Sequence, residues 1–297
     1  MHTLREIRRL LDEAGLRPRK RLGQAFLIDG NLLGKLLELA ELRGDETVLE
    51  VGPGTGSLTE ELLARAAEVV AVEVDPALCE LLRRRLGGRA GLRLICGDAL
   101  ASKHALSPDV LAALGPGSHL VANLPYQIAT PLVAECLRQS WRSLQGRGEW
   151  SCRFDRLTFT VQKEVADRFA AACGSRAYGP VSVVAALLGR LRLGPIVPAG
   201  AFWPRPKVAS RIVRIDLDGA RARELADADV LSALLSAAFG QRRKQLWTAL
   251  RSRSAPFAAE VLASSLEEAG IAPTCRAEQV GPNQYLALAN VVAAAIP

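Results

Sequence analysis

Apolar residues along the chain follow two alternating patterns. Short runs rich in Val, Leu and Ile have the length of buried strands, and between them apolar residues recur every three or four positions, as on one face of a helix. The predicted strands are 46–52, 69–74, 92–96, 118–123 and 156–162, and the predicted helices are 3–14, 31–42, 57–66, 76–86, 130–139 and 163–172. Strands that alternate with helices predict an α/β fold with a parallel sheet covered on both faces.

The pattern changes in the second half of the chain. Two β-rich runs at 190–197 and 208–217 predict an antiparallel pair at the sheet edge. Beyond residue 218 the strand pattern ends, and only helical segments follow, at 229–240, 243–252, 257–270 and 284–294. We therefore predict an α/β domain over 1–217 and a small all-helical domain over 218–297. Residues 141–155 look like a surface insertion between a helix and a strand.

Composition narrows the class of protein. The 297 residues are 49% hydrophobic, which is enough for a large core, and the net charge of +7 favours an anionic partner. The six cysteines form no C-x-x-C pair and only three histidines are present, so we expect no metal site, no disulfide framework and a reducing compartment. The charged first segment lacks the apolar centre of a secretory signal, and no apolar run could span a membrane. We expect a soluble, cytoplasmic protein.

A glycine-rich loop follows the first strand of the predicted sheet. Gly52, Gly54 and Gly56 stand between a strand and a helix, where the backbone can approach a ligand closely. The dinucleotide pattern G-x-G-x-x-G would need a glycine at the position of Ser57. Such loops also occur without ligands, so the loop alone does not establish a binding site.

Two acidic residues follow the next two strands. Glu73 ends the second strand, where an acid commonly binds ribose hydroxyls, and Asp98 follows the third strand, where a carboxylate can accept from an exocyclic amine. Either residue could instead be a solvated acid or a helix cap. Because the carboxyl ends of parallel strands share one edge, the loop and both acids indicate an adenosine-containing ligand, NAD or S-adenosylmethionine. The glycine spacing favours the latter.

The sequence NLPY follows the fourth strand and reaches the same edge. Asn123 offers an amide oxygen, the stiff Leu124–Pro125 turn can aim a main-chain carbonyl, and Tyr126 can stack on a base. Two acceptors that hold both N6 hydrogens of adenine would localise its lone pair for methyl transfer. The alternatives are a turn-forming Asn and a packing Tyr. The neighbouring adenosine-site pattern favours the catalytic interpretation.

These motifs together resemble the KsgA-type small-subunit ribosomal RNA adenine dimethyltransferases over nearly the whole chain. The resemblance rests on RPRKRLGQAFLID, VGPGTGSLT, VEVD, GDAL, NLPYQIATPL, QKEVADRFAA, YGPVSV, FWPRPKVASRIVRI, AFGQRRKQLWTAL and RAEQVGPNQYLALAN. It implies a Rossmann-like S-adenosylmethionine-dependent methyltransferase sheet with a helical C-terminal RNA-binding domain. It also implies N6-dimethylation of two adjacent adenines near the 3′ end of small-subunit rRNA.

The resemblance also implies roles for individual residues. At the cofactor, Gly52 and Gly54 would line the methionine and ribose, Glu73 would bind the ribose hydroxyls, Asp98 would meet the adenine amine and Leu27 would pack against the ligand.

In the same way, Asn123 and Tyr126 match the catalytic turn of the family, with Asn123 also at the cofactor. Phe202 matches the aromatic residue that clamps the target base, although an ordinary buried Phe is the alternative. Ala25 stands where the family usually has Asn, and it keeps the cofactor contact only if that contact uses the main chain.

Three basic clusters are expected to contact RNA phosphates. They contain Arg17, Arg19, Lys20 and Arg21; Arg205, Lys207, Arg211 and Arg214; and Arg242, Arg243, Lys244, Arg251 and Arg253. A solvated surface is the alternative for any one cluster. The expected partner is small-subunit rRNA within an assembling 30S-type particle, and the expected state is a monomer.

Three other functions compete with this one. An Erm-like methyltransferase would act on large-subunit rRNA, but PRPKV and QRRK favour the small-subunit family. A nucleic-acid-binding factor could keep the fold without catalysis, although the intact NLPY motif argues against it. An NAD oxidoreductase would need the missing third glycine and a hydride-transfer acid or base.

Overall fold

The computed structural model describes residues 1–252 and 257–296, and in this part the chain forms two compact units. The first comprises Met1–Ala166 and Arg192–Asp216, and the second comprises Asp167–Leu191 and Leu217–Pro297. The segment 218–297, expected to be a domain by itself, lies in the second unit together with residues 167–191 from the middle of the chain. Arg253 of the third basic cluster lies outside the described residues.

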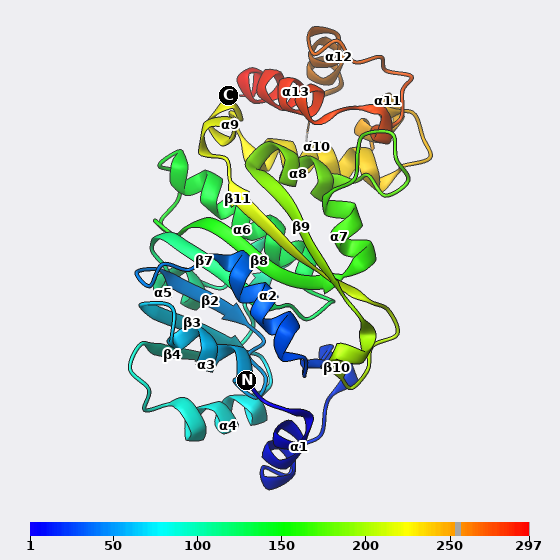
Figure 1. Cartoon of the computed structure of the whole chain (residues 1–297). Coiled ribbons are helices and arrows are strands. Elements are labelled where there is room, and N and C mark those ends of the chain that lie inside the picture. The colour runs from blue at the N-terminus through cyan, green and yellow to red at the C-terminus, as the bar shows by residue number, and fades with distance from the viewer. Residues whose placement is uncertain (253–256, 297) are drawn as a thin grey trace. The chain divides into compact units, whose positions relative to one another are not determined.

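A seven-stranded sheet forms the centre of the first unit (Figure 1). Its order is β4-β3-β2-β7-β8-β11-β9, and the strands are β2 (Thr47–Val51), β3 (Glu68–Glu73), β4 (Leu92–Cys96), β7 (Pro116–Asn123), β8 (Arg153–Gln162), β9 (Gly189–Val197) and β11 (Ser210–Leu217). The pairs from β4 to β8 are parallel, and β11 runs antiparallel to β8. The structure confirms the predicted parallel sheet and places the two predicted β-rich runs, as β11 and β9, next to β8 at one end of it.

Most helices of the first unit pack against this sheet (Figure 1). They are α2 (Gly30–Ala40), α3 (Ser57–Leu63), α4 (Pro76–Leu86), α5 (Pro108–Ala113) and α6 (Ala129–Leu144). The unit also contains α1 (Leu4–Glu13), which packs against Phe26 and α4, and the first part of α7 (Lys163–Phe169). Capping residues set several helix starts, because a side-chain oxygen satisfies backbone N–H groups that lack a partner within the helix. Asp75 caps α4 by accepting from the N–H of Ala77 at 3.1 Å, and Pro76 occupies the first turn.

Short elements complete the first unit. They are the 3-10 turns η1 (Lys20–Leu22) and η2 (Ala199–Ala201) and the small strands β1 (Phe26–Leu27), β5 (Leu100–Ser102), β6 (Ala105–Leu106) and β10 (Phe202–Trp203). β1 and β10 pair antiparallel, which brings Leu27 opposite Phe202. This pairing joins two segments that are far apart in the sequence and that the apolar pattern does not predict as strands.

The second unit is helical in the part that the structure describes, apart from the ends of β9 and β11. Its helices are the last part of α7, α8 (Pro180–Leu188), α9 (Gly219–Glu224), α10 (Ala228–Gly240), α11 (Leu246–Leu250), α12 (Ala259–Glu268), η3 (Ala277–Gln279) and α13 (Pro282–Ala295). Two buried tyrosines brace η3 and the residue after it, since Tyr285 Oη donates to the Ala277 carbonyl at 3.0 Å and Tyr178 Oη to the Val280 carbonyl at 2.9 Å. No helix in the described ranges is long and apolar enough to cross a membrane.

The predicted surface insertion at 141–155 is wrong at both of its ends. Helix α6 continues to Leu144, and β8 begins at Arg153. Trp141, Cys152 and Phe154 are fully buried, so most of the apolar side chains in this stretch belong to the core. The expectation failed because α6 continues five residues beyond the predicted end at residue 139, and the scattered polar residues of this stretch hide its apolar face in the sequence.

The sequence predicts no disulfide framework, but the structure contains a disulfide between Cys79 and Cys96, whose Cα atoms lie 5.9 Å apart. β4 pairs with β3 so that Cys96 lies opposite Glu73, and α4 returns along the same strands to bring Cys79 close. The pair is created by tertiary packing, and its sequence spacing gives no sign of it.

Candidate functional site

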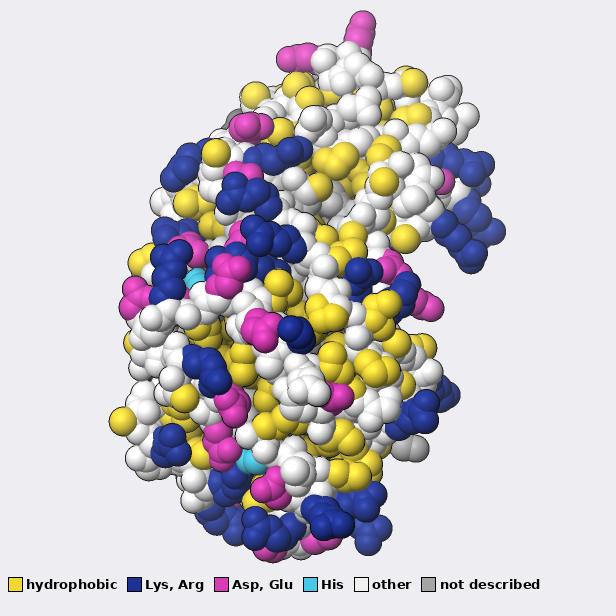
Figure 2. All heavy atoms as spheres, viewed as in Figure 1, with side chains coloured by type: hydrophobic (Ala, Val, Ile, Leu, Met, Phe, Trp, Pro, Cys, Tyr) yellow, Lys and Arg dark blue, Asp and Glu magenta, His cyan; other side chains and the backbone are white. Residues whose placement is uncertain are grey.

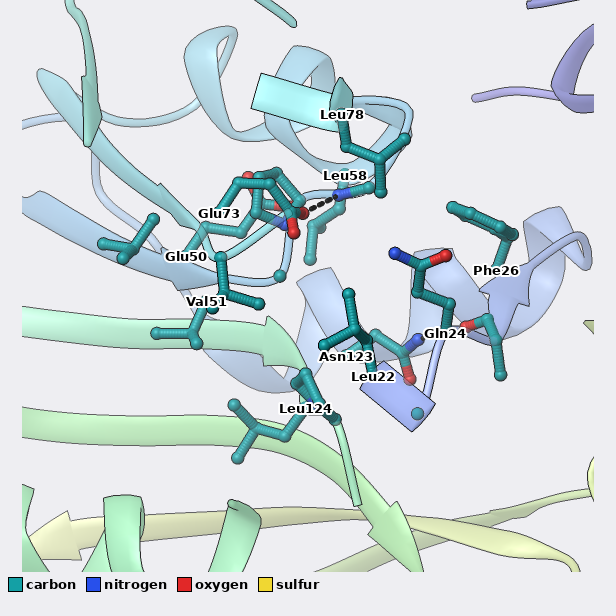
Figure 3. A pocket seen from close by; sticks show the side chains of 18 of the residues that line it. Leu22, Gln24, Phe26, Glu50, Val51, Leu58, Glu73, Leu78, Asn123 and Leu124 are labelled. Atoms are coloured by element: carbon teal, nitrogen blue, oxygen red, sulfur yellow. Dashed lines mark hydrogen bonds between the residues drawn. The ribbon is translucent and has the colours of Figure 1, made fainter. Parts of the chain in front are cut away.

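A cavity of about 230 Å³ lies at the carboxyl ends of the central strands. The glycine loop after β2, Glu73 at the end of β3, the segment 97–99 after β4 and the turn after β7 line it, and residues 22–27 complete its wall. Figure 3 shows Glu73, Gln24 and Asn123 around the same space, each from a different element. The structure therefore brings the separate motifs of the sequence together at one site.

The glycine loop is built for close approach of the backbone. Gly52 and Gly54 have φ angles of 75° and 61°, a region that side chains disfavour. A Cβ atom on Gly54 would lie 2.8 Å from Cε1 of Phe26, and one on Gly52 would lie 3.1 Å from Cγ of Pro125. Both glycines are therefore needed for the loop to fit between β1 and the turn after β7.

Glu73 fixes this loop from the adjacent strand. Its side chain is only 4% exposed, and Oε2 accepts from the Gly54 N–H at 3.2 Å while Oε1 accepts from the Asp75 N–H at 2.9 Å. Burial raises the pKa of Glu73 to about 6, although these backbone hydrogen bonds oppose the rise. Glu73 is thus mostly an anion at neutral pH, and it lines the cavity.

Asp98 stands at the rim of the cavity rather than within it. It follows β4 by two residues, is exposed, and accepts from the Leu100 N–H at 3.0 Å. Its carboxylate can therefore meet a polar group of a ligand without losing its own hydration entirely.

Asn123 has the most unusual polar environment in the site. It ends β7, and its Nδ2 donates to the main-chain oxygen of Ala25 at 3.0 Å. Its Oδ1 is buried and has no hydrogen-bond partner among the described residues. A buried acceptor without a partner is costly and uncommon in folded proteins. The contact with Ala25 fixes the amide so that the free oxygen is the acceptor left for a ligand.

The rest of the NLPY turn also lines the cavity. The Leu124 N–H donates to the Thr160 carbonyl at 3.2 Å, and the Ile128 N–H closes the turn onto the Pro125 carbonyl at 3.2 Å. Tyr126 is half-buried, and its hydroxyl lies 2.8 Å from Oγ of Ser210. Burial raises the pKa of Tyr126, so the ring stays neutral. This anchored, neutral ring is suited to stacking.

Phe202 is the one predicted site residue that the structure does not bring to the cavity. Its side chain is 2% exposed and packs in the core beside Leu27. The neighbouring Trp203 is half-buried and stacks on Phe26 with ring centroids 6.3 Å apart. In this arrangement Phe202 matches the buried alternative, and its role against a base stays a prediction.

The remaining predicted residues, Ala25 and Leu27, both line the cavity. Sequence reasoning did not identify Glu50, Gln24, Phe26 and Thr55, which line it as well. Glu50 could have been identified from the sequence, because an acid within the apolar run of a buried strand is rare unless it has a partner or a function.

The charge of the cavity limits what it can bind. In the part of the chain that the structure describes, its lining contains the carboxyl groups of Glu50, Glu73 and Asp98 and no Lys, Arg or His. A diphosphate would be repelled here, whereas a ligand with net positive charge would be attracted. S-adenosylmethionine carries a sulfonium and therefore fits the residues present better than NAD does. Within the described ranges, no group of three or more His, Cys, Asp and Glu side chains could hold a metal ion.

Basic side chains lie outside the cavity. Lys and Arg side chains gather around α1 in Figure 2, and Arg17, Arg205 and Lys207 are exposed as an RNA contact requires. The expected RNA contact of Arg214 is wrong. Its side chain is 3% exposed and pairs with Glu41 and Asp216, each at 2.8 Å. An apparent basic cluster thus contains a structural ion pair.

Comparisons with known proteins agree with this geometry. Residues 15–294 match the family described as ribosomal RNA adenine dimethylase. The chain is 40% identical to ribosomal RNA small subunit methyltransferase A of Paenarthrobacter aurescens (strain TC1), over 96% of this chain and 92% of the relative. It is also 40% identical to the protein of that name from Paracoccus denitrificans (strain Pd 1222), over 97% and 96%.

Solved structures show the same fold. A dimethyladenosine transferase from Plasmodium falciparum matches with a TM-score of 0.67 at 23% identity, covering 89% of this chain and 95% of that one. The 23S rRNA methyltransferase ErmE matches with a TM-score of 0.57 at 25% identity, covering 90% and 99%. With a family match over nearly its whole length and full-length relatives at this identity, the chain belongs to the ribosomal RNA adenine dimethylase family.

Proposed function

We propose that this enzyme transfers methyl groups from S-adenosylmethionine to N6 of two adjacent adenines near the 3′ end of small-subunit rRNA. The observation that carries the chemistry is the buried Oδ1 of Asn123, which lacks a partner and lies in the wall of an acid-lined cavity. Relatives at 40% identity named small subunit methyltransferase A support the choice of small-subunit over large-subunit rRNA.

The cofactor would be held by residues from three strands and β1. The backbone of Gly52 and Gly54 would approach it closely, Glu73 would accept from the ribose hydroxyls, Asp98 would accept from the adenine amine, and Leu27 would provide an apolar contact. S-adenosylmethionine supplies an electrophilic methyl group when bound. The Ala25 carbonyl contributes by holding the Asn123 amide, and it can do so with any side chain at that position.

The chain's own part in catalysis is to prepare the acceptor nitrogen. The N6 lone pair of adenine is delocalised into the ring, and Asn123 Oδ1 accepts one N6 hydrogen while a carbonyl of the Leu124–Pro125 turn accepts the other. Holding both hydrogens localises the lone pair on nitrogen and orients it. Tyr126 stacks on the extruded base. The surplus proton passes to solvent, so no side-chain base is required.

The RNA is positioned by surfaces outside the cavity. Exposed Arg17, Arg205 and Lys207 of the first unit and Arg243 and Lys244 of the second can contact phosphates, which position an RNA without reading its sequence. We include in the proposal that residues 218–297 act as an RNA-binding domain and that the enzyme works as a cytoplasmic monomer on an assembling small-subunit particle.

One experiment tests the proposed substrate. The enzyme is incubated with methyl-labelled S-adenosylmethionine and, separately, with immature small subunits, free small-subunit rRNA and large subunits. The expected product is labelled dimethyladenosine in small-subunit RNA, found by nucleoside analysis. Label in large subunits instead would indicate an Erm-like activity. Binding to RNA without any label would indicate a binding factor, and either result would refute the proposal.

A further inference from the structure

Glu50 is a buried acid in the wall of the cavity that the chemistry above does not use. It lies next to the end of β2, two residues before Gly52, and its side chain is 1% exposed. Thr59 of α3 donates its hydroxyl proton to Glu50 Oε2 at 2.6 Å. A carboxyl group at this depth needs either a positive partner or a proton.

Among the residues that the structure describes, no positively charged group pairs with Glu50. From β3 the neighbour is the charged Glu73, and from α3 it is the neutral hydroxyl of Thr59. The other titratable groups of the cavity are Asp98 and Tyr126. Burial raises the pKa of Glu50 to about 8, and the negative charge of Glu73 adds to the rise while the Thr59 hydrogen bond opposes it. In the free protein Glu50 therefore carries its proton at neutral pH.

We propose that Glu50 is a specificity-determining residue for the methyl donor: protonated in the free protein, it releases its proton to solvent when the cationic donor binds. The inference rests on the proposed use of S-adenosylmethionine. A positive charge inside a cavity of about 230 Å³ shifts the balance toward the carboxylate, because opposite charges interact strongly away from water. The site then has a negative charge when the donor is present and a neutral group when it is absent.

The same device distinguishes donor from product. Methyl transfer removes the sulfonium charge, so S-adenosylhomocysteine is less positive than S-adenosylmethionine by one charge. Glu50 loses its counter-charge and takes a proton back from solvent. The cavity then holds the neutral product without the ion pair that favoured the donor, which helps the product to leave.

Calorimetry measures the released proton directly. S-adenosylmethionine is titrated into the whole protein near neutral pH in phosphate and in Tris, whose ionisation enthalpies differ, so that the heat difference counts protons. The ligand's own α-amino group titrates at about pH 7.7–8.0 and can also exchange a proton on binding. The same titration with Glu50→Gln measures that background. We expect the wild type to release most of one proton more than Glu50→Gln. The affinity of the wild type for S-adenosylmethionine, divided by that of Glu50→Gln, should rise by up to about tenfold per pH unit and level off above the pKa of Glu50.

Two controls make the result specific. Glu61→Gln removes one charge from α3 outside the cavity and should leave the proton release unchanged. S-adenosylhomocysteine should cause a smaller release from the wild type than the donor does. Equal release with both ligands, or equal release from the wild type and Glu50→Gln, would overturn the inference.

A second variant serves if Glu50→Gln does not fold. Thr59→Val removes the hydrogen bond to the Glu50 anion, so the pH at which the donor affinity levels off should move upward. An unchanged midpoint would overturn the inference. Failure of the wild type to bind S-adenosylmethionine at any pH would refute the proposed function itself, which keeps the two failures distinct.

Discussion

Replacing Asn123 with Ala should remove most of the methyl-transfer activity while leaving the fold almost equally stable. The wild-type side chain makes one hydrogen bond, from Nδ2 to the Ala25 carbonyl at 3.0 Å, and buries Oδ1 without a partner. The variant loses the hydrogen bond but also removes the unsatisfied oxygen. These two effects on the free energy of unfolding have opposite signs.

Their magnitudes nearly cancel. A hydrogen bond of this kind contributes about 1 kcal/mol, and a buried acceptor without a partner costs about 1–3 kcal/mol. The carbonyl that the variant leaves free belongs to Ala25, which is only half-buried. The free energy of unfolding should therefore change by less than about 2 kcal/mol in either direction. Methyl transfer should fall by about 100–1,000-fold, the usual loss when one preorganised hydrogen-bonding group is removed from an active site.

Two assays separate these effects. Urea unfolding gives the stability, and single-turnover transfer of labelled methyl groups to small-subunit RNA gives the rate, with RNA binding measured alongside. Asn290 is the matched control, because its Oδ1 accepts from the Ala226 N–H at 2.8 Å and its Nδ2 donates to the Glu224 carbonyl at 2.7 Å. Asn290→Ala should lose about 1–3 kcal/mol of stability and keep its affinity for the donor. Full activity of Asn123→Ala, or a stability loss above about 3 kcal/mol, would refute the reasoning.

Three further predictions follow from the cavity. Glu73→Ala should weaken donor binding by at least about tenfold in calorimetry, since the hydrogen bond to Gly54 and the charged acceptor are both lost, and an unchanged affinity would remove Glu73 from the site. Gly54→Ala should destabilise the protein by about 1–3 kcal/mol in urea unfolding, because φ is 61° and the new Cβ would meet Phe26; unaltered stability would contradict this. The pKa of Glu50 is raised to about 8 in the folded protein, against about 4.3 in the unfolded chain. The protonated side chain therefore contributes its full stabilisation below about pH 4.3, and this contribution is lost as the pH rises through about 8. Between about pH 6 and 8 the wild type should therefore lose roughly 2–3 kcal/mol relative to Glu50→Gln, and parallel pH profiles of the two proteins would show that Glu50 is not protonated.

The parallel sheet and the helices flanking it could be predicted from the sequence because strand burial and helix faces leave local periodic patterns. The runs that became β2, β3, β4 and β7 are bounded within a few residues by polar or glycine-rich segments. The small strands β1 and β10 could not be found this way. They contain two residues each and exist because distant segments pair, which no local pattern records.

Basic and aromatic residues near the site show that clustering in the sequence does not reveal which side chains are exposed. Arg214 follows Arg211 in a stretch with few acids, yet its charge is neutralised by Glu41 of a distant segment. Phe202 and Trp203 are adjacent in a strand, where successive side chains point to opposite sides. Phe202 therefore lies in the core, whereas Trp203 is half-buried. Counting charges or aromatic residues cannot decide which of them face solvent.

The sequence by itself determined the class of fold, the edge of the sheet where the cavity lies and the motifs that meet there. Apolar periodicity decides which side chains leave water, and parallel strands end at one edge. Only the tertiary structure decided how those motifs act on one another. The Ala25 carbonyl holds an amide 98 residues away, and the walls around Glu50 remove water without supplying a positive charge. Hydrogen-bond partners and local dielectric depend on every segment that packs against a group, so a free acceptor at Asn123 and a protonated acid at Glu50 become visible only once the chain has folded.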